Sequence, residues 1–379
     1  MAFVTLKDVA QRAGVSAAAV SQILHNKGRF SSDTRQLVLK TVEEMGYVPD
    51  QRARSMRSSD TKTVGLLVPD LRNPYFADLV SSMEDELYAQ GYSTLIGTSA
   101  ETVERQDAFI DNLLGQRIDG AIVVPQGVNS PGMQSLIARE LPLVFVDRLV
   151  SGVNSVPFVV SDPYPGVCEA VAELVRLGHR HIGFVSHSSL GSSNINEREA
   201  AFRSAVAQVT QLGEGTAAVV DCDSTYVSRE AGLNELVRAG VTAIICAYSP
   251  DMITMIGLLH DRGIDIGSEM SVISFDDIAV FRLLTPQVAI ISQQAEDMGR
   301  QGVDMLLDMI INNDCSRGES RYVPSSFVLR DSVGAPMWRV PGYCSVYQVH
   351  EGWVYALNSA DVPTSLTTLV KGYIIIFIS

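Results

Sequence analysis

The sequence predicts a small all-α head at the N-terminus, followed by a larger core of two parallel-sheet α/β units. Three observations predict this fold. Residues 1–48 hold three short helical patterns, and strand patterns alternate with helical patterns from Thr63 onward. The charges also divide unevenly. Residues 1–62 hold ten Lys and Arg against six Asp and Glu, while the remainder holds 19 against 37. The whole chain has a net charge of −14. A basic head on an acidic body is typical of a protein that meets phosphates at one end.

The head begins with two helices joined by a tight turn at Gly14. The first helix has small or apolar side chains at helical spacing, at Val9, Ala10 and Ala13. Ser16 caps the second helix, whose predicted buried stripe is Val20, Ile23 and Leu24. Its outward face then carries Ala17, Ala18, Ser21 and Gln22. This pattern predicts a helix-turn-helix whose second helix fits the DNA major groove. The alternative is an ordinary three-helix domain with a solvated basic face.

A third helix is expected from Ser31 to about Met45, followed by a short basic stretch at 50–57 and a polar linker at 58–62. Beyond the linker the sequence predicts strands at 64–68, 93–97, 121–124, 143–146, 182–185, 219–220, 243–246 and 271–275. Helices are predicted at 75–90, 103–114, 167–177, 197–209, 227–239 and up to Arg262. Such alternation implies parallel sheets covered on both faces, with ligands bound at the carboxyl ends of the strands.

Several classes of protein are disfavoured by composition. The N-terminus lacks the long apolar stretch of a signal peptide, and no run reaches the roughly 18 apolar residues of a membrane span. The five cysteines contain no CxxC pair and are expected to be buried free thiols in a reducing cytoplasm. We find no zinc-type ligand pattern, no P-loop and no Ser-His-Asp arrangement. No catalytic residue, metal or cofactor is therefore predicted.

The order of motifs resembles the lactose-repressor (LacI/GalR) family of bacterial transcription regulators from about Thr5 to about Arg330. The motifs are the Val-Ser…Val-Ser recognition helix, Gly46-Tyr-Val-Pro, the Ala53-Arg54 hinge, Val64-Gly-Leu-Leu-Val, Asn73-Pro-Tyr-Phe, Arg117-Ile-Asp-Gly-Ala-Ile, Leu177-Gly-His-Arg-His-Ile-Gly-Phe, Phe275-Asp-Asp-Ile and Thr285-Pro. The resemblance implies a periplasmic-binding-protein-like core. In it the chain passes between two subdomains three times, near Ser161, Ile291 and Tyr322.

The resemblance also implies domain boundaries. Residues 1–48 are the helix-turn-helix head, and 49–62 are the hinge helix and linker. The N-terminal core subdomain takes 63–161 and about 291–321, and the C-terminal one takes 162–290 and about 322–333. The final strand, Tyr322–Leu329, is expected to close the second sheet, so that the core is complete by about Val333.

On the recognition helix, Ala17, Ala18 and Gln22 occupy the family's base-reading positions. The alanines offer only apolar contacts, and plain helix propensity explains them equally well, whereas Gln22 is suited to pair with adenine. Phosphate contacts are expected from Thr5, Ser16, Ser21, Asn26, Ser31 and Thr34, and from Arg29 near the loop. In the hinge, Ala53 and Met56 resemble the segment that folds on DNA and wedges a side chain into the minor groove. Off DNA we expect a disordered linker there.

The predicted effector-binding residues are Tyr75, Phe76, Arg198, Tyr248, Asp276 and Gln293. The two aromatics at 75 and 76 are suited to stack on a sugar or base. Arg198 resembles the family's donor to effector hydroxyls, and Asp276 resembles its acceptor. Tyr248-Ser249 replaces the family's usual Asn-Asp, which puts the common sugar contacts in doubt. Val288-Ala-Ile-Ile291 replaces Leu-Thr-Thr-Val, although Gln293 and Gly299 keep their places. Each of these side chains could instead be purely structural.

The tail, 334–379, is atypical, since family chains tend to end near 325–333. It has no periodicity and ends in the uncharged segment Tyr373–Ile378, which has high β propensity. A read-through or shifted-frame extension is our leading interpretation, and an extra interaction segment is the alternative.

The sequence thus predicts a cytoplasmic, nucleoid-associated transcriptional regulator, most simply a repressor. It would act as a homodimer on a pseudo-palindromic double-stranded DNA operator, without a membrane partner. A small sugar, pentose or nucleoside-like effector would bind between the two subdomains. The rivals are a sugar-binding enzyme with an accessory head and a solute receptor for transport. The sequence leaves open the effector, the operator, the direction of the response and the choice of dimer or tetramer.

Overall fold

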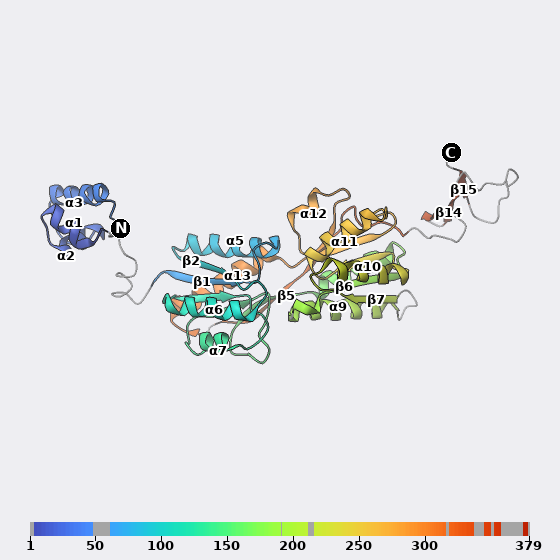
Figure 1. Cartoon of the computed structure of the whole chain (residues 1–379), viewed down its shortest axis with the longest axis horizontal. Helices are drawn as coiled ribbons and strands as arrows, with labels where there is room; N and C mark the ends of the chain where they lie inside the picture. The colour runs from blue at the N-terminus through green and yellow to red at the C-terminus, as the bar shows by residue number, and fades with distance from the viewer. Residues whose placement is uncertain are drawn as a thin grey trace. The chain divides into compact units, whose positions relative to one another are not determined.

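The protein is described here from a computed structural model of the whole chain (Figure 1). The structure describes residues 4–47, 61–190, 192–210, 216–315 and 318–336, together with three short strands in the tail. The chain forms two compact units, Met1–Thr61 and Lys62–Ser379. The hinge positions Ala53 and Met56 lie outside the described residues.

The head consists of the helices α1 (Leu6–Ala13), α2 (Ala17–Leu24) and α3 (Ser32–Met45). Each begins at a hydroxyl side chain that accepts a hydrogen bond from the third backbone amide of its helix, and these caps are Thr5, Ser16 and Ser31. Gly14 and Gly46 end α1 and α3 in the left-handed conformation. The predicted core residues Val9, Ala10, Ala13, Val20 and Ile23 are buried, whereas Leu24 is half-buried. The helix-turn-helix prediction is confirmed.

The first lobe of the core has a six-stranded parallel sheet in the order β11-β5-β4-β3-β1-β2. Its strands are β1 (Thr63–Val68), β2 (Ser93–Thr98), β3 (Gly120–Val123), β4 (Leu143–Val146), β5 (Phe158–Asp162) and β11 (Arg321–Pro324). Its helices are α5 (Pro74–Ala89), α6 (Val103–Gly115), α7 (Pro131–Ile137) and α13 (Ala295–Asn312). Figure 1 shows the orange α13 beside the blue α5, although the two lie far apart in the sequence.

Alternate residues of β1 show how both faces of this sheet are covered. Leu66 packs in one cluster with side chains of α5 and α13, and Leu67 packs in another with side chains of α6 and α7. A strand buried on both faces must be apolar throughout, which explains the unbroken Val-Gly-Leu-Leu-Val run.

The second lobe repeats this arrangement with the strand order β12-β10-β9-β8-β6-β7. Its strands are β6 (His181–Ser186), β7 (Thr216–Asp221), β8 (Ala243–Cys246), β9 (Ser271–Phe275), β10 (Ala289–Ser292) and β12 (Ser326–Val328), and only β12 is antiparallel to its neighbour. The helices are α8 (Tyr164–Arg176), α9 (Ser193–Thr210), α10 (Tyr226–Arg238), α11 (Ser249–Asp261) and the short α12 (Ala279–Leu283), with a 3-10 turn at Ser188–Leu190. The predicted fold class is confirmed.

The three passages between the lobes lie slightly further along the chain than expected. The first follows β5 at Asp162, and the second follows β10 at Ser292. The third corrects our expectation of a single strand at Tyr322–Leu329. β11 pairs with β5 in the first sheet, and β12 pairs with β10 in the second. Ser325 separates the two strands, and its hydroxyl accepts a hydrogen bond from the backbone amide of Gly166.

The core also continues beyond Val333, which corrects the predicted end. The carbonyl of Gly334 accepts a hydrogen bond from Nε2 of buried His179 at 2.8 Å, and its amide donates to Ser271. Further on, the tail contains the strands β13 (Ser345–Val349), β14 (Gly352–Leu357) and β15 (Ile374–Phe377) in a separate sheet. Because the tail sequence has no periodicity, β13 and β14 were not predicted. β15 falls on the segment Tyr373–Ile378, which has high β propensity.

The cysteine prediction is only partly confirmed. Cys168, Cys222, Cys246 and Cys315 are free thiols, but Cys168 is half-buried and Cys315 is exposed. No helix in the described part of the chain has the length and apolar character needed to cross a membrane.

Candidate functional site

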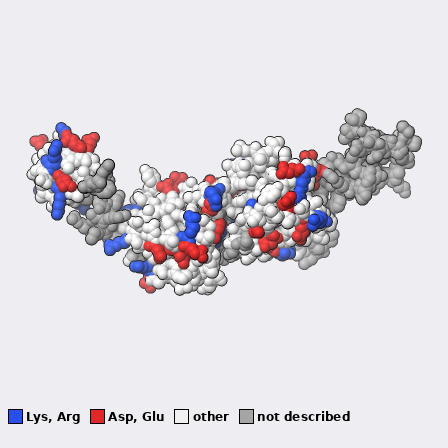
Figure 2. All heavy atoms as spheres, in the orientation of Figure 1, with Lys and Arg blue, Asp and Glu red and all other residues white. Residues whose placement is uncertain are grey.

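The head presents the N-termini of its helices together with their capping side chains. The predicted phosphate-contacting residues Thr5, Ser16 and Ser31 are the three helix caps, and the Thr34 hydroxyl lies 2.8 Å from that of Ser31. Free amides at a helix N-terminus attract anions. Their position therefore suits phosphate binding, and Figure 2 shows Lys and Arg side chains running down the head.

The exposed surface of α2 is narrower than the sequence predicted. Gln22 and Ala18 are exposed, whereas Ala17 and Ser21 are half-buried. Ala17 packs against the core of the head. The reason is that residues 17, 21 and 24 follow one edge of the helix, next to the buried stripe. Of the four residues predicted to face outward on α2, Ala18 and Gln22 are therefore the exposed ones.

The loop after α2 contains a pair that the sequence did not reveal. Asn26 adopts the left-handed conformation with φ 53°, and its side-chain oxygen accepts a hydrogen bond from Arg35 on α3 at 2.6 Å. Only the amide group of Asn26 remains to donate to a phosphate. Arg29 is exposed, as expected for a phosphate contact.

In the core, the predicted effector-binding residues lie at the carboxyl ends of strands in both lobes. Tyr75 begins α5 behind the cap Asn73, and its ring meets that of Phe76 edge to face at 5.0 Å. The Tyr75 hydroxyl donates to Oδ1 of Asp147 at 2.7 Å. Burial raises the pKa of Tyr75 well above its usual value, and the charge of Asp147 raises it further. Tyr75 is therefore a neutral hydrogen-bond donor.

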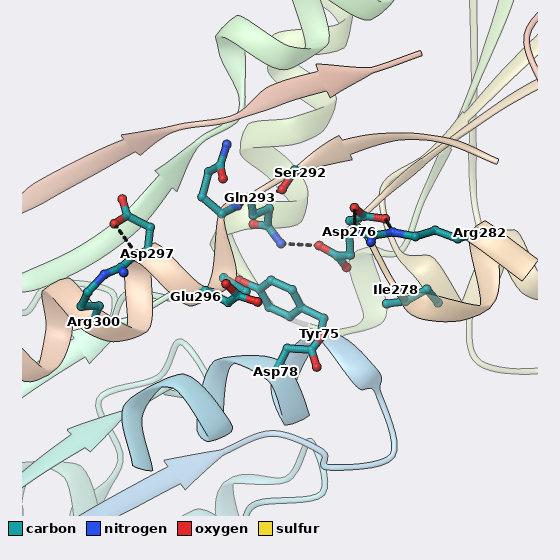
Figure 3. Close-up of a pocket in the computed structure, with 13 residues that line it drawn as sticks. Tyr75, Asp78, Asp276, Ile278, Arg282, Ser292, Gln293, Glu296, Asp297 and Arg300 are labelled. Atoms are coloured by element: carbon teal, nitrogen blue, oxygen red, sulfur yellow. Dashed lines mark hydrogen bonds and ion pairs between the residues drawn. The ribbon is translucent and has the colours of Figure 1, made fainter. Parts of the chain in front are cut away.

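Asp276 is the buried acceptor of the second lobe, directly after β9. Its carboxylate accepts hydrogen bonds from Gln293 at 2.6 Å and from Ser249 at 3.2 Å. Burial raises the pKa of Asp276, while the positive charge of Arg198 opposes this shift. Figure 3 shows Tyr75 coming from α5, Asp276 from the second lobe, and Gln293 bonded to Asp276. These three side chains line a cavity of about 250 Å³ that also borders Asp78 and Glu296.

Arg198 is held on two sides within the second lobe. Its Nη1 donates to the carbonyl of Ala247 at 2.5 Å, and its guanidinium lies over the ring of Phe275 at 4.5 Å. Stacking and a carbonyl contact fix the plane of the guanidinium, which leaves further donors for a ligand. Phe76, Arg198 and Tyr248 are not among the residues that line the cavity of Figure 3.

Tyr248 rests on a buried polar network. Its ring meets that of His187 edge to face at 5.2 Å. Nδ1 of His187 lies 2.7 Å from Asp251, whose other oxygen accepts from Arg229 at 2.7 Å. Burial raises the pKa of Tyr248 to about 12. The ring is thus a neutral side chain on a rigid support.

Sequence reasoning missed a group of side chains from the first lobe. Asp147 and Arg148 directly follow the predicted strand β4, and that position at a carboxyl end was the signal that could have identified them. Both terminal nitrogens of Arg148 donate to Glu101, at 2.7 and 3.1 Å. Asn194 at the start of α9 reaches across to Asp147 at 3.3 Å. This contact joins the two lobes.

Left-handed backbone conformations occur at four residues shortly after strand ends. Glu101, Asp147 and Asp276 have φ of 58°, 66° and 69°, and Gln294 has 61°. Such conformations cost about 1–3 kcal/mol each at residues other than glycine and cluster at binding sites. Together with the convergent polar side chains, they make the region between the lobes the candidate ligand site. The described residues include no cluster of three or more His, Cys, Asp or Glu side chains that could hold a metal.

A helix-turn-helix head and a two-lobed α/β core with a polar site between the lobes define a DNA-binding regulator that responds to a small molecule. Comparisons with known proteins agree. Residues 5–50 match the family described as bacterial regulatory proteins, lacI family, and residues 171–333 match the periplasmic binding protein-like domain.

Individual relatives extend the match over most of the chain. The HTH-type transcriptional repressor PurR of Erwinia tasmaniensis is 30% identical, covering 84% of this chain and 93% of the relative. The ribose operon repressor of Bacillus subtilis is 28% identical, covering 81% and 91%. A lac repressor dimer bound to operator and the anti-inducer ONPF superposes with a TM-score of 0.75 at 23% identity, covering 88% and 100%. The chain belongs to the lacI family of bacterial regulatory proteins, and it is a transcriptional regulator with an effector-binding domain.

Proposed function

We propose that this regulator is a repressor whose affinity for a palindromic operator is controlled by a small polyhydroxylated effector, a pentose or a nucleoside-like compound. The observation that carries the proposal is the convergence of Asp276 and Arg198 of the second lobe with Tyr75 and Asp147 of the first. Carboxylates accept hydrogen bonds from hydroxyls, whereas the guanidinium donates them. A neutral molecule with several hydroxyls matches this set.

The aromatic side chains narrow the class of effector. Tyr75 and Phe76 are buried at the site, and Tyr248 is half-buried opposite them. Aromatic faces stack on sugar rings and on bases, so they favour a flat ligand over a linear one. The relative named as the ribose operon repressor supports the pentose class.

For the DNA side we propose that Gln22 and Ala18 read bases and that Thr5, Ser16, Ser31, Thr34 and Arg29 contact phosphates. Two heads must meet the two halves of one operator, so the active species is a homodimer. Its place of action is the bacterial cytoplasm, on the nucleoid. Residues 49–62 serve as the hinge, and the two subdomains of the core hold the effector.

Two measurements test this function on the full-length protein. A thermal-shift screen of pentoses, hexoses, nucleosides and their phosphates should raise the melting temperature only for true effectors. A gel shift with the upstream DNA of its own gene should detect a palindrome, bound less tightly as salt increases because phosphate contacts dominate affinity. Binding that is unchanged between low and moderate salt, or a screen without any response, would contradict the proposal. Turnover of a bound sugar would favour the rival enzyme function.

A further inference from the structure

Arg148 is a buried cation of the first lobe, and its guanidinium is already paired with the carboxylate of Glu101. Its side chain is 4% exposed, and its guanidinium lies 5.4 Å from the ring of Phe76. Glu101 binds both terminal nitrogens in a fork-to-fork arrangement. The remaining nitrogen, Nε, is buried without a hydrogen-bond partner and lies 3.6 Å from Asp147. Nε is therefore the one nitrogen of Arg148 without a hydrogen-bond partner, and Glu101 occupies both terminal nitrogens.

Glu101 is placed to hold that fork from the loop after β2. It has a left-handed backbone, with φ 58°, directly after Ala100 with φ 45°. Two successive left-handed residues other than glycine persist only where the surroundings compel them. The pair lies beside two residues of the candidate site, because the Arg148 guanidinium is 5.4 Å from the ring of Phe76 and its Nε is 3.6 Å from Asp147.

The other arginines around the site are engaged as well. Arg72 pairs with Asp70 at 2.9 Å, and Arg198 faces Asp276 while donating to a backbone carbonyl. The carboxylates near these arginines outnumber them, and they are Asp70, Glu101, Asp147, Glu197 and Asp276. A phosphate group entering this site would meet net negative charge, and it would have to displace Glu101 to bind both terminal nitrogens of Arg148.

We propose that Glu101 is a specificity-determining residue, because it occupies both terminal nitrogens of Arg148 and so prevents anions from binding to them. The effector is then the neutral, unphosphorylated compound, and its phosphate ester is rejected. This inference rests on the proposed function of the site. It goes further because it predicts that the protein discriminates between a sugar and its phosphate ester, and it assigns this discrimination to the carboxylate of Glu101.

The test compares ribose with ribose 5-phosphate, and adenosine with its 5′-monophosphate, by isothermal titration calorimetry on the full-length protein. For the wild type we expect the neutral member of one pair to bind at least about a hundredfold more tightly than its ester. Glu101→Gln removes the charge but keeps the size of the side chain. It should tighten binding of the ester by about tenfold or more and change binding of the neutral member only slightly.

Two further variants identify the cause of that gain. Glu104→Gln removes the same charge from an exposed position three residues along the chain, and we expect it to leave the discrimination unchanged. Adding Arg148→Gln to Glu101→Gln should abolish the gained affinity for the ester, because the fork itself is then lost. Melting temperatures and operator binding of each variant report whether it is folded.

The outcomes separate the two proposals. If the wild type binds a neutral compound and its ester equally well, or if Glu101→Gln is folded and still rejects the ester, the inference about Glu101 is wrong and the effector class stands. If no member of either pair binds, the proposed effector class is wrong and the inference falls with it.

Discussion

Gln293 donates a hydrogen bond of 2.6 Å to Asp276, and this bond ties the second passage between the lobes to the acceptor of the ligand site. Gln293 directly follows β10, and Asp276 directly follows β9. A ligand hydroxyl that reaches Asp276 therefore approaches one of the three segments that connect the two lobes. A change in the relative position of the lobes would act directly on this side of the candidate site.

The first prediction concerns this acceptor. Asp276→Ala and Arg198→Ala should each weaken effector binding by about 1–3 kcal/mol, because each leaves a polar partner unpaired in the bound state. Operator binding should stay intact, since both residues lie in the core. Effector titrations of a gel shift provide the measurement, with Arg203→Ala, exposed on the same helix as Arg198, as the matched control. A wild-type response from both Ala variants would contradict the assignment of the site.

The second prediction separates base reading from phosphate contact on the head. Gln22→Ala should weaken binding to the true operator by about 1–3 kcal/mol and relax the preference at one symmetric base position. Arg29→Ala should weaken binding to all sequences alike and reduce the salt dependence. Binding to a library of operator variants measures both effects. Identical specificity profiles for the two variants would show that Gln22 does not read a base.

The third prediction is a pH dependence of stability that arises at His179. Burial lowers the pKa of His179 to about 4, and the hydrogen bond to the carbonyl of Gly334 opposes the shift only in part. The unfolded chain, with the ordinary pKa of 6.5, therefore binds more protons than the native state between these two values. The stabilising effect of neutral His179 is complete above about pH 7, and it decreases as the pH falls toward 4.

Between pH 7 and pH 5 this group alone should lower the free energy of unfolding by about 2 kcal/mol. Urea unfolding of the wild type and of His179→Gln at both pH values measures the effect. The variant should be less stable at pH 7, but it should lose less stability on acidification. An equal loss in both proteins would mean that His179 is not the responsible group.

The fourth prediction concerns the end of the core. Truncation after Val333 removes the Gly334 carbonyl that accepts a hydrogen bond from the buried ring of His179, so it should destabilise the protein by about 1–3 kcal/mol. Truncation after Pro336 keeps this contact and should leave stability, operator binding and effector binding unchanged. Thermal melts of the two truncated proteins decide between them. Equal stability would indicate that the Gly334 contact contributes little, and loss of effector binding in the longer form would assign the tail to the core.

The sequence by itself determined the elements whose signals are local. Thr5, Ser16 and Gly14 set the ends of the first two helices through capping and left-handed geometry, so the helix-turn-helix could be predicted. The strands Leu143–Val146, Ala243–Cys246 and Ser271–Phe275 were predicted with the bounds that the structure has, because a strand buried on both faces is mostly apolar along its length. The family resemblance, at a position directly after such a strand, indicated Asp276 as a site residue.

Only the tertiary structure decided what depends on neighbours far apart in the chain. No local pattern distinguishes β11 from β12, because their assignment to different sheets follows from the partners β5 and β10. The pairing of Glu101 with Arg148 joins loops 47 residues apart, and neither residue has a local signal for the other. The partial burial of Ala17 likewise follows from how three short helices pack around one core. Periodicity and caps report a residue's own helix or strand, whereas a binding site is formed by the ends of several strands that only folding brings together.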